Sequence, residues 1–245
     1  MASSSARTLR RIGHYAYVVV RDVVIIVLSA LLVSFVIKTF LIRSFSIPTG
    51  SMLDTLQIDD RVIVSQLTPG LIDVNRGDVV VFVDPGGWLP SGLATEDDPL
   101  TNLFNWVSVQ LGMPDQSLNN HLIKRVIGLP GDTVACCDSL GSLSVNGVPL
   151  NETYLRLPNG TTAASGESFS VKVPENSLWV MGDNRYNSAD SRRNMDKPGG
   201  GFVPLENVVG RAIVISWPQE RWTWLSNYPE TFIGVTLKEA VPFLE

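Results

Sequence analysis

The stretch HLIKRVIGLPGD, residues 121–132, predicts a β-strand that ends in a tight turn. Apolar residues, several of them β-branched, fill most of it, and a Pro-Gly pair follows at once, as is typical of strand ends. Successive side chains of a strand point to opposite faces, so Lys124 should lie among the apolar side chains of Leu122 and Val126. Arg125 then points to the opposite face, where we expect it to meet solvent.

Stretches of the same kind recur along the chain and are also predicted as strands. A helical pattern of 10 to 15 residues between them, which a parallel sheet requires, is missing. Asn146 and Gly147 predict a tight hairpin turn. We therefore expect a mainly β fold, with antiparallel strands in one large domain preceded by one transmembrane helix. The further predicted strands are residues 61–67, 78–83, 133–137, 143–150, 168–174, 177–183 and 208–217.

Residues 23–42 predict the transmembrane helix. The first 15 carry no charge, and the whole stretch has the ~20 residues that cross ~30 Å of hydrocarbon. More basic residues precede the stretch than lie at its end, and this difference favours a cytoplasmic amino terminus. We expect a cytoplasmic segment at 1–22, an anchor in the cell membrane at 23–42 and an extracytoplasmic domain at 43–245.

A cleaved signal peptide is the alternative to this anchor. The basic start, the apolar centre and the small-x-small pattern at Ser44 and Ser46 all fit it. However, the apolar stretch is longer than a typical signal centre. Cleavage after Ser46 would also leave Ser51 near a loose terminus, so a retained anchor is preferred.

Two other segments allow more than one interpretation. Residues 84–120 are predicted as an insertion that contains a short amphipathic helix at about 99–112, which either packs on the sheet or rests on the lipid surface. Near the carboxyl end, Trp217, Trp222 and Trp224 fit either a membrane interface or ordinary packing.

The composition excludes several classes of function. The net charge is −5 and no basic stripe is present, which makes nucleic acid an unexpected partner. The two histidines and the adjacent Cys136 and Cys137 lack the spacing of a zinc site, so no metal or other cofactor is expected. His14 precedes the anchor, so serine chemistry beyond it would need another base. The two adjacent cysteines could form a disulfide with each other, remain thiols or pair between chains, and of these we expect one buried and one exposed thiol.

The stretch SIPTGSMLDTL, residues 46–56, offers a nucleophile. Gly50 leaves the approach to the Ser51 hydroxyl open, and Pro48 stiffens the lead-in. Lys124 is the candidate base, because an apolar environment disfavours the ammonium and lowers the pKa of a lysine from about 10.4. A neutral lysine can accept the proton of a serine hydroxyl. The third candidate segment is WVMGDNRYNSADSRR, residues 179–193, a strand followed by a loop rich in hydrogen-bonding side chains.

Together, SIPTGSMLDTL, RGDVVVF, KRVIGLPGD and GDNRYNSADSR resemble the motifs of the bacterial type I signal peptidases, membrane-anchored serine proteases with a serine-lysine dyad. The resemblance implies that Ser51 is the nucleophile and Lys124 the general base. It implies an oxyanion hole formed by the Ser51 N–H and the Thr49 hydroxyl. It further implies that Ser188 orients the lysine amine, that Asp190 pairs with Arg192, and that Asp183 supports the loop.

The resemblance also implies the substrate. Signal peptides have small residues at the first and third positions before the cut, and shallow apolar pockets would accept them. By position in the motifs, the candidates for lining these pockets are Phe45, Ile47, Pro48 and Ile123. The partners would be signal-peptide-bearing preproteins and the lipid bilayer. An extended substrate could add itself to a strand edge nearby.

Two alternatives are kept beside this interpretation. The first is a peptidase dedicated to one substrate. The second is a catalytically silent, membrane-anchored β domain that binds exported chains. The sequence leaves the oligomeric state open.

Overall fold

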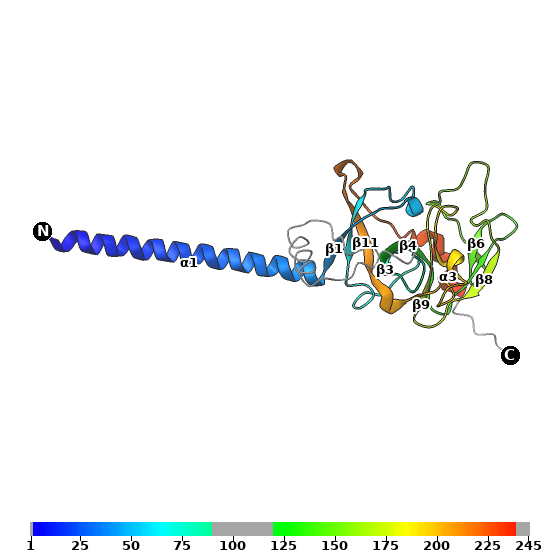
Figure 1. Cartoon of the computed structure of the whole chain (residues 1–245), viewed down its shortest axis with the longest axis horizontal. Coiled ribbons are helices and arrows are strands. Elements are labelled where there is room, and N and C mark those ends of the chain that lie inside the picture. The colour runs from blue at the N-terminus through cyan, green and yellow to red at the C-terminus, as the bar shows by residue number, and fades with distance from the viewer. Residues whose placement is uncertain (1, 90–119, 239–245) are drawn as a thin grey trace. The chain divides into compact units, whose positions relative to one another are not determined.

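The computed structural model describes residues 2–89 and 120–238, which form two units (Figure 1). The first unit comprises residues 1–41 and the second residues 42–245. The first is the helix α1 (Ala2–Phe40). Its segment Tyr17–Ile37 has a mean hydropathy of 2.5 and is long and apolar enough to cross a membrane. The helix ends before residue 42, because Ile42 already pairs with Ser65 in a sheet.

The larger sheet of the second unit is antiparallel throughout (Figure 1). The strand β11, late in the sequence, lies between β2 and β3, so strands from the beginning and from the later part of this unit share one sheet. Its order is β1 (Ile42–Ser46), β2 (Arg61–Ser65), β11 (Val208–Trp217), β3 (Val79–Val83), β4 (His121–Gly128), β9 (Ser177–Met181) and β10 (Val203–Pro204), with β12 (Thr223–Trp224) paired to β11.

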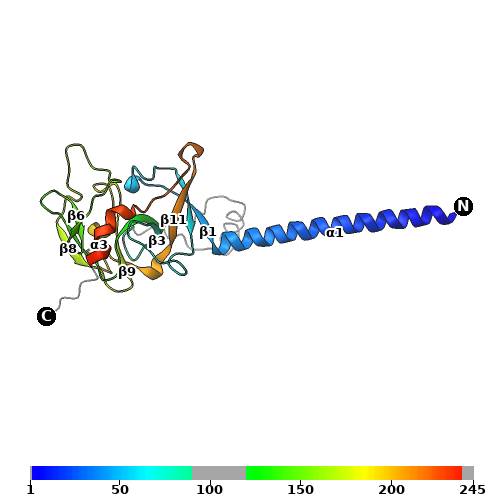
Figure 2. The same ribbon diagram turned by 180° about the vertical axis from the view of Figure 1, so that it is seen from behind.

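A smaller antiparallel sheet has the order β7 (Val148–Pro149), β6 (Leu143–Val145), β5 (Thr133–Cys136) and β8 (Phe169–Lys172). Figure 2 shows β6 and β8 beside the helix α3 (Ile233–Lys238), at the end of this unit opposite to β1. Asn146 and Gly147 connect β6 to β7 with φ values of 52° and 75°, as a type I′ hairpin turn requires.

Short 3₁₀ helices connect the strands. Among the described residues they are η1 (Gly50–Met52), η3 (Ser191–Asn194), η4 (Leu205–Asn207), η5 (Gln219–Arg221) and η6 (Pro229–Phe232). The first two of these carry the serine segment and the end of the polar loop. The structure confirms the mainly β, antiparallel fold, and each predicted strand stretch contains an observed strand.

The central strand β4 is buried on both faces, which explains one wrong prediction. Arg125 was expected to meet solvent, but its side chain is fully buried. Alternation along a strand predicts solvent only where one face of the sheet is uncovered. Here Ile123, Val126 and Ile127 each belong to a different hydrophobic cluster, so both faces of β4 are covered.

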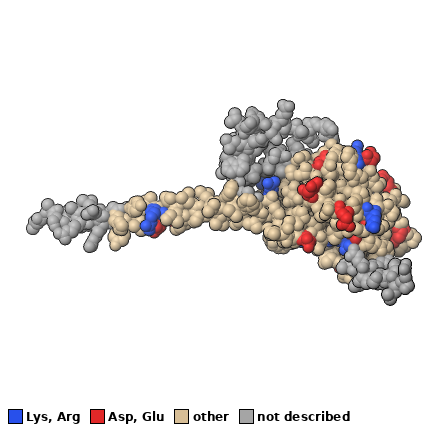
Figure 3. Space-filling model, turned by 90° about the horizontal axis from the view of Figure 1, so that it is seen from below, with Lys and Arg blue, Asp and Glu red and all other residues tan. Residues whose placement is uncertain are grey.

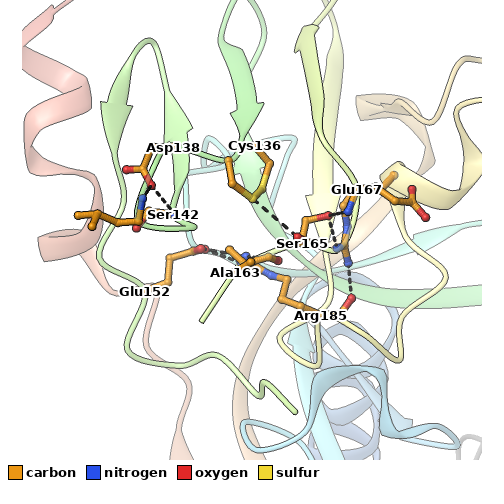
Figure 4. The surroundings of a disulfide bond; sticks show 12 residues. Cys136, Asp138, Ser142, Glu152, Ala163, Ser165, Glu167 and Arg185 are labelled. Atoms are coloured by element: carbon orange, nitrogen blue, oxygen red, sulfur yellow. Dashed lines mark hydrogen bonds and ion pairs between the residues drawn. A yellow bond between two sulfur atoms is a disulfide. The ribbon is translucent and has the colours of Figure 1, made fainter. Parts of the chain in front are cut away.

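The prediction for the two cysteines was also wrong. Cys136 and Cys137 form a disulfide with each other, and the peptide bond between them is cis. The expectation of two thiols assumed that neighbouring side chains of a strand point to opposite faces. Strand β5 ends at Cys136, so Cys137 is not held to that alternation. Figure 4 shows the surroundings of this bond, where Cys137 Sγ lies 3.8 Å from the Ser165 carbonyl oxygen.

The remaining expectations concern the surface. The helix predicted at 99–112 lies outside the described residues. Trp217, Trp222 and Trp224 are each more than half exposed. On the face drawn in Figure 3, acidic and basic side chains are interspersed over the second unit.

Candidate active site

Ser51 and Lys124 meet inside the second unit, although 73 residues separate them in the sequence. Ser51 lies in η1, which follows β1, and Lys124 lies in the centre of β4. The distance from Lys124 Nζ to Ser51 Oγ is 2.8 Å. Both side chains are buried, with 7% and 4% of their surface exposed. A proton can pass directly between two groups at this separation.

The environment of Lys124 favours the neutral amine. Burial lowers the pKa of Lys124 to about 8, although the negative charges of Asp190 and Asp183 partly oppose this shift. The amine nitrogen also lies 2.8 Å from the Ile123 carbonyl oxygen, which fixes its position. A substantial fraction of the amine is therefore neutral near pH 8 and able to accept a proton.

Thr49 is the nearest hydroxyl to the serine on the same segment. Its Oγ1 lies 3.4 Å from Ser51 Oγ, and the residue is exposed at the surface. A hydroxyl at this place can turn toward an oxygen that develops negative charge on a bound peptide. The role in the oxyanion hole implied by the resemblance remains a prediction.

The loop after β9 is hydrogen-bonded to the backbone of the serine segment. The Asn184 N–H donates to the Ser51 carbonyl oxygen at 3.1 Å, and Asn184 Nδ2 donates to the Gly50 carbonyl oxygen at 2.9 Å. The sequence predicted a polar loop at this place but no role for Asn184. A buried carbonyl needs a donor, and a loop asparagine can supply two at once, but only the fold shows which carbonyls it reaches.

Asp190 and Arg192 form an ion pair within this loop, with Arg192 Nη2 and Asp190 Oδ2 2.8 Å apart. The same carboxylate accepts a hydrogen bond from the Gly182 N–H at 3.0 Å. Arg192 also donates to the Arg185 carbonyl oxygen. The pair thus ties the end of β9 to the start of η3.

Asp183 is linked to the strand that carries the lysine. Its carboxylate pairs with Arg125, whose Nη2 lies 2.6 Å from Asp183 Oδ2, and it accepts a hydrogen bond from Thr55 Oγ1 at 2.6 Å. The guanidinium of Arg125 also lies over the ring of Tyr154, 4.1 Å from its centroid. These contacts connect the segment after η1, the strand β4 and the loop after β9 around the serine and the lysine.

Ser188 is buried close to the serine segment, with 2% of its surface exposed. Within residues 2–89 and 120–238, its Oγ has no hydrogen-bond partner. A Cβ atom on Gly182 would overlap with this Oγ and with the Ser51 carbonyl oxygen, so glycine leaves both groups their places. The contact of Ser188 with the lysine amine stays a prediction.

Three of the four residues expected to line substrate pockets belong to one hydrophobic cluster, namely Phe45, Ile47 and Ile123. The fourth, Pro48, is exposed. The cluster also contains Met52, the residue after the serine. The structure therefore gathers these apolar side chains in a cluster that includes the residue next to Ser51, and their contact with a substrate stays a prediction. In the described ranges, no group of three or more His, Cys, Asp or Glu side chains could share a metal ion.

The sequence of this chain is similar to those of known proteins. Residues 20–217 match the model of a family described as signal peptidase, peptidase S26. The chain is 37% identical over 214 residues to the probable signal peptidase I of Mycobacterium leprae, an alignment covering 77% of this chain and 73% of that protein. It is 35% identical over 223 residues to signal peptidase I of Mycobacterium tuberculosis H37Rv, covering 82% and 74%. It is 36% identical over 185 residues to signal peptidase I of Leptolyngbya laminosa, covering 76% and 73%. This chain therefore belongs to the signal peptidase family, peptidase S26, and is a serine peptidase that hydrolyses peptide bonds.

Proposed function

We propose that this chain cleaves signal peptides from exported preproteins, with Ser51 as nucleophile and Lys124 as general base. The observation that carries the proposal is the 2.8 Å separation between Ser51 Oγ and the buried amine of Lys124. Burial keeps part of this amine neutral, as its pKa of about 8 indicates. The family relationship supports the choice of substrate.

In the first half of the reaction, Ser51 Oγ attacks the carbonyl carbon of the residue before the cut. Its proton passes to Lys124 Nζ, and the resulting oxyanion accepts hydrogen bonds from the Ser51 N–H and the Thr49 hydroxyl. Such a donor contributes roughly 3 kcal/mol in comparable proteases. Lys124 then gives its proton to the nitrogen of the leaving mature chain, which departs and leaves the signal peptide esterified to Ser51.

In the second half, water attacks this ester while Lys124 accepts a proton from it. The tetrahedral species collapses, Ser51 Oγ regains a proton from Lys124, and the signal peptide is released. The apolar side chains of Phe45, Ile47 and Ile123 would limit the residues before the cut to small ones. Their apolar character and their place in one cluster with Met52, the residue after the nucleophile, support this role.

We place the helix α1 across the cell membrane, with its amino terminus in the cytoplasm and the β domain outside. The apolar span Tyr17–Ile37 and the arginines that precede it support this topology. A protease added to intact spheroplasts tests it. It should degrade the β domain only if that domain is outside the cell membrane.

The catalytic proposal is tested with purified full-length protein in lipid vesicles and a model preprotein. Ser51→Ala and Lys124→Ala should leave the preprotein uncut and keep the far-ultraviolet dichroism of the wild type. Ser170→Ala and Lys172→Ala are matched controls, because both residues are exposed on β8. Cleavage at the wild-type rate by either dyad variant would disprove the assignment. Capture of the preprotein by the wild type without any cleavage would favour the silent binding domain instead.

A second experiment separates a general peptidase from a dedicated one. Depletion of the protein in its cell should cause many different precursors to accumulate. Accumulation of a single precursor would show that the enzyme serves one substrate.

A further inference from the structure

A polar pocket of about 460 Å³ opens beside the serine segment. Asp54 and Asn184 line one part of it, and the loop of residues 155–159 lines the other. Nothing in the catalytic proposal uses this pocket. Its position follows from Asn184, which both lines the pocket and donates to the carbonyl oxygens of Gly50 and Ser51.

The pocket and the candidate signal-peptide subsites lie on different parts of the domain. Phe45, Ile47 and Ile123 belong to the cluster under β1, β2 and β11. Leu155, which lines the pocket, packs instead against the cluster under the smaller sheet. An extended peptide advances by about 3.3 Å per residue. A substrate whose residues before the cut contact the first cluster, and which stays extended past Ser51, would present the residues after the cut to the pocket.

The backbone of the pocket loop is hydrogen-bonded to the active-site loop, and the pocket exposes two charged side chains. The Arg156 N–H donates to the Asp183 carbonyl oxygen at 2.8 Å, which links residues 155–159 to the loop that supports Ser51. The side chains of Arg156 and Asp54 form an ion pair at 2.9 Å, yet 55% and 64% of their surfaces are exposed. Such an exposed pair stabilises the fold little and can exchange partners.

We propose that this pocket binds the first residues of the mature protein and that Arg156 favours an acidic side chain there. This proposal rests on the proposed function. A guanidinium has five N–H donors and can hold two carboxylates at once, and Arg156 commits only its Nη1 to Asp54. Asp54 competes with the substrate for the same guanidinium. The ion pair therefore sets how strongly the enzyme prefers an acid over a neutral residue.

The experiment uses the full-length enzyme in neutral lipid vesicles and peptides that contain one cleavage site. Glutamate, glutamine or lysine is placed in turn at each of the first four mature positions, and kcat/KM is measured for each peptide. At one position the wild type should cleave the glutamate peptide about two- to fivefold faster than the glutamine peptide, as an exposed ion pair allows. Arg156→Gln should bring this ratio to one, and Asp54→Asn should raise it.

Controls separate this proposal from the catalytic one. Lys172→Gln removes an equal charge from an exposed residue of β8 and should keep the wild-type ratio. Cleavage of the glutamine peptide at equal rates by the wild type and Lys172→Gln shows that the dyad is intact. If that peptide is cut but the ratio is the same in the wild type, Arg156→Gln and Asp54→Asn, the pocket does not select charge. If no peptide is cut by the wild type, the proposed function itself fails.

Discussion

Arg125 and Asp183 form a fully buried ion pair that joins the strand of the candidate base to the loop behind the nucleophile. Arg125 Nη1 also donates to the Gly77 carbonyl oxygen at 2.7 Å. The two charges are thus satisfied away from water. Because Arg125 directly follows Lys124, this pair fixes the backbone on which the amine depends.

We predict that Arg125→Gln destabilises the protein strongly. It leaves the Asp183 carboxylate buried without its counter-charge, which costs about 3–5 kcal/mol of the free energy of unfolding. Urea denaturation followed by tryptophan fluorescence measures the change. Lys172→Gln removes an exposed positive charge and should change this free energy by less than about 0.5 kcal/mol. A loss below 1 kcal/mol in Arg125→Gln would contradict the structural role of the pair.

The activity should rise with pH through the pKa of Lys124. Below about pH 8 the amine carries a proton and cannot accept another, so kcat/KM should fall about tenfold for each pH unit on the acid side. Above the pKa the amine is neutral and kcat/KM should level off. The measurement is kcat/KM of a neutral peptide from pH 5.5 to 9.5, with circular dichroism at each pH. A flat profile in folded enzyme would exclude lysine as the base.

Ser188→Ala should lower the activity without lowering the stability. The buried Oγ has no hydrogen-bond partner in the described parts of the chain, so its removal should leave the Tm unchanged or slightly raised. If Ser188 orients Lys124 when substrate binds, kcat/KM should still fall about 10²-fold.

The matched control is Ser191→Ala. Ser191 is also buried, but its Oγ accepts a hydrogen bond from the Val180 N–H at 2.9 Å. This variant should lose stability and keep most of the activity. An active Ser188→Ala enzyme would remove Ser188 from the mechanism.

Gly182→Ala should inactivate the enzyme through the backbone. The added Cβ would lie 2.5 Å from the Ser51 carbonyl oxygen and 2.7 Å from Ser188 Cβ, so the serine segment must move. A displacement of about 1 Å can lower the rate about 10²-fold. Peptide cleavage measures the effect, with Gly70→Ala as the control because, among the described residues other than its chain neighbours, no atom lies within 4 Å of its added Cβ. Wild-type activity in Gly182→Ala would show that the loop tolerates the shift.

The strands were predictable from the sequence because their signals are local. Short stretches rich in β-branched residues, bounded by turn residues such as Asn146 and Gly147, mark them without any knowledge of their partners. The pairing order was not predictable. Strand β11 lies between β2 and β3 although more than 120 residues separate it from either, and no local pattern specifies that choice.

The site was predictable only in part, because the sequence reveals local motifs but not the contacts between distant segments. Ser51 and Lys124 stand in motifs, so the resemblance named them. The burial of Arg125 was missed, because alternation along a strand does not reveal whether the second face of a sheet is covered. Asn184, Arg156 and Asp54 were assigned no role, since their positions depend on contacts between segments that are distant in the sequence.

The bond between Cys136 and Cys137 has a practical use. These are the only two cysteines in the chain, and both sulfur atoms are occupied. A cysteine introduced by mutagenesis would then be the sole thiol of the oxidised protein. A maleimide dye or spin label could be attached there selectively, so that binding of a preprotein can be followed spectroscopically without removing either native cysteine.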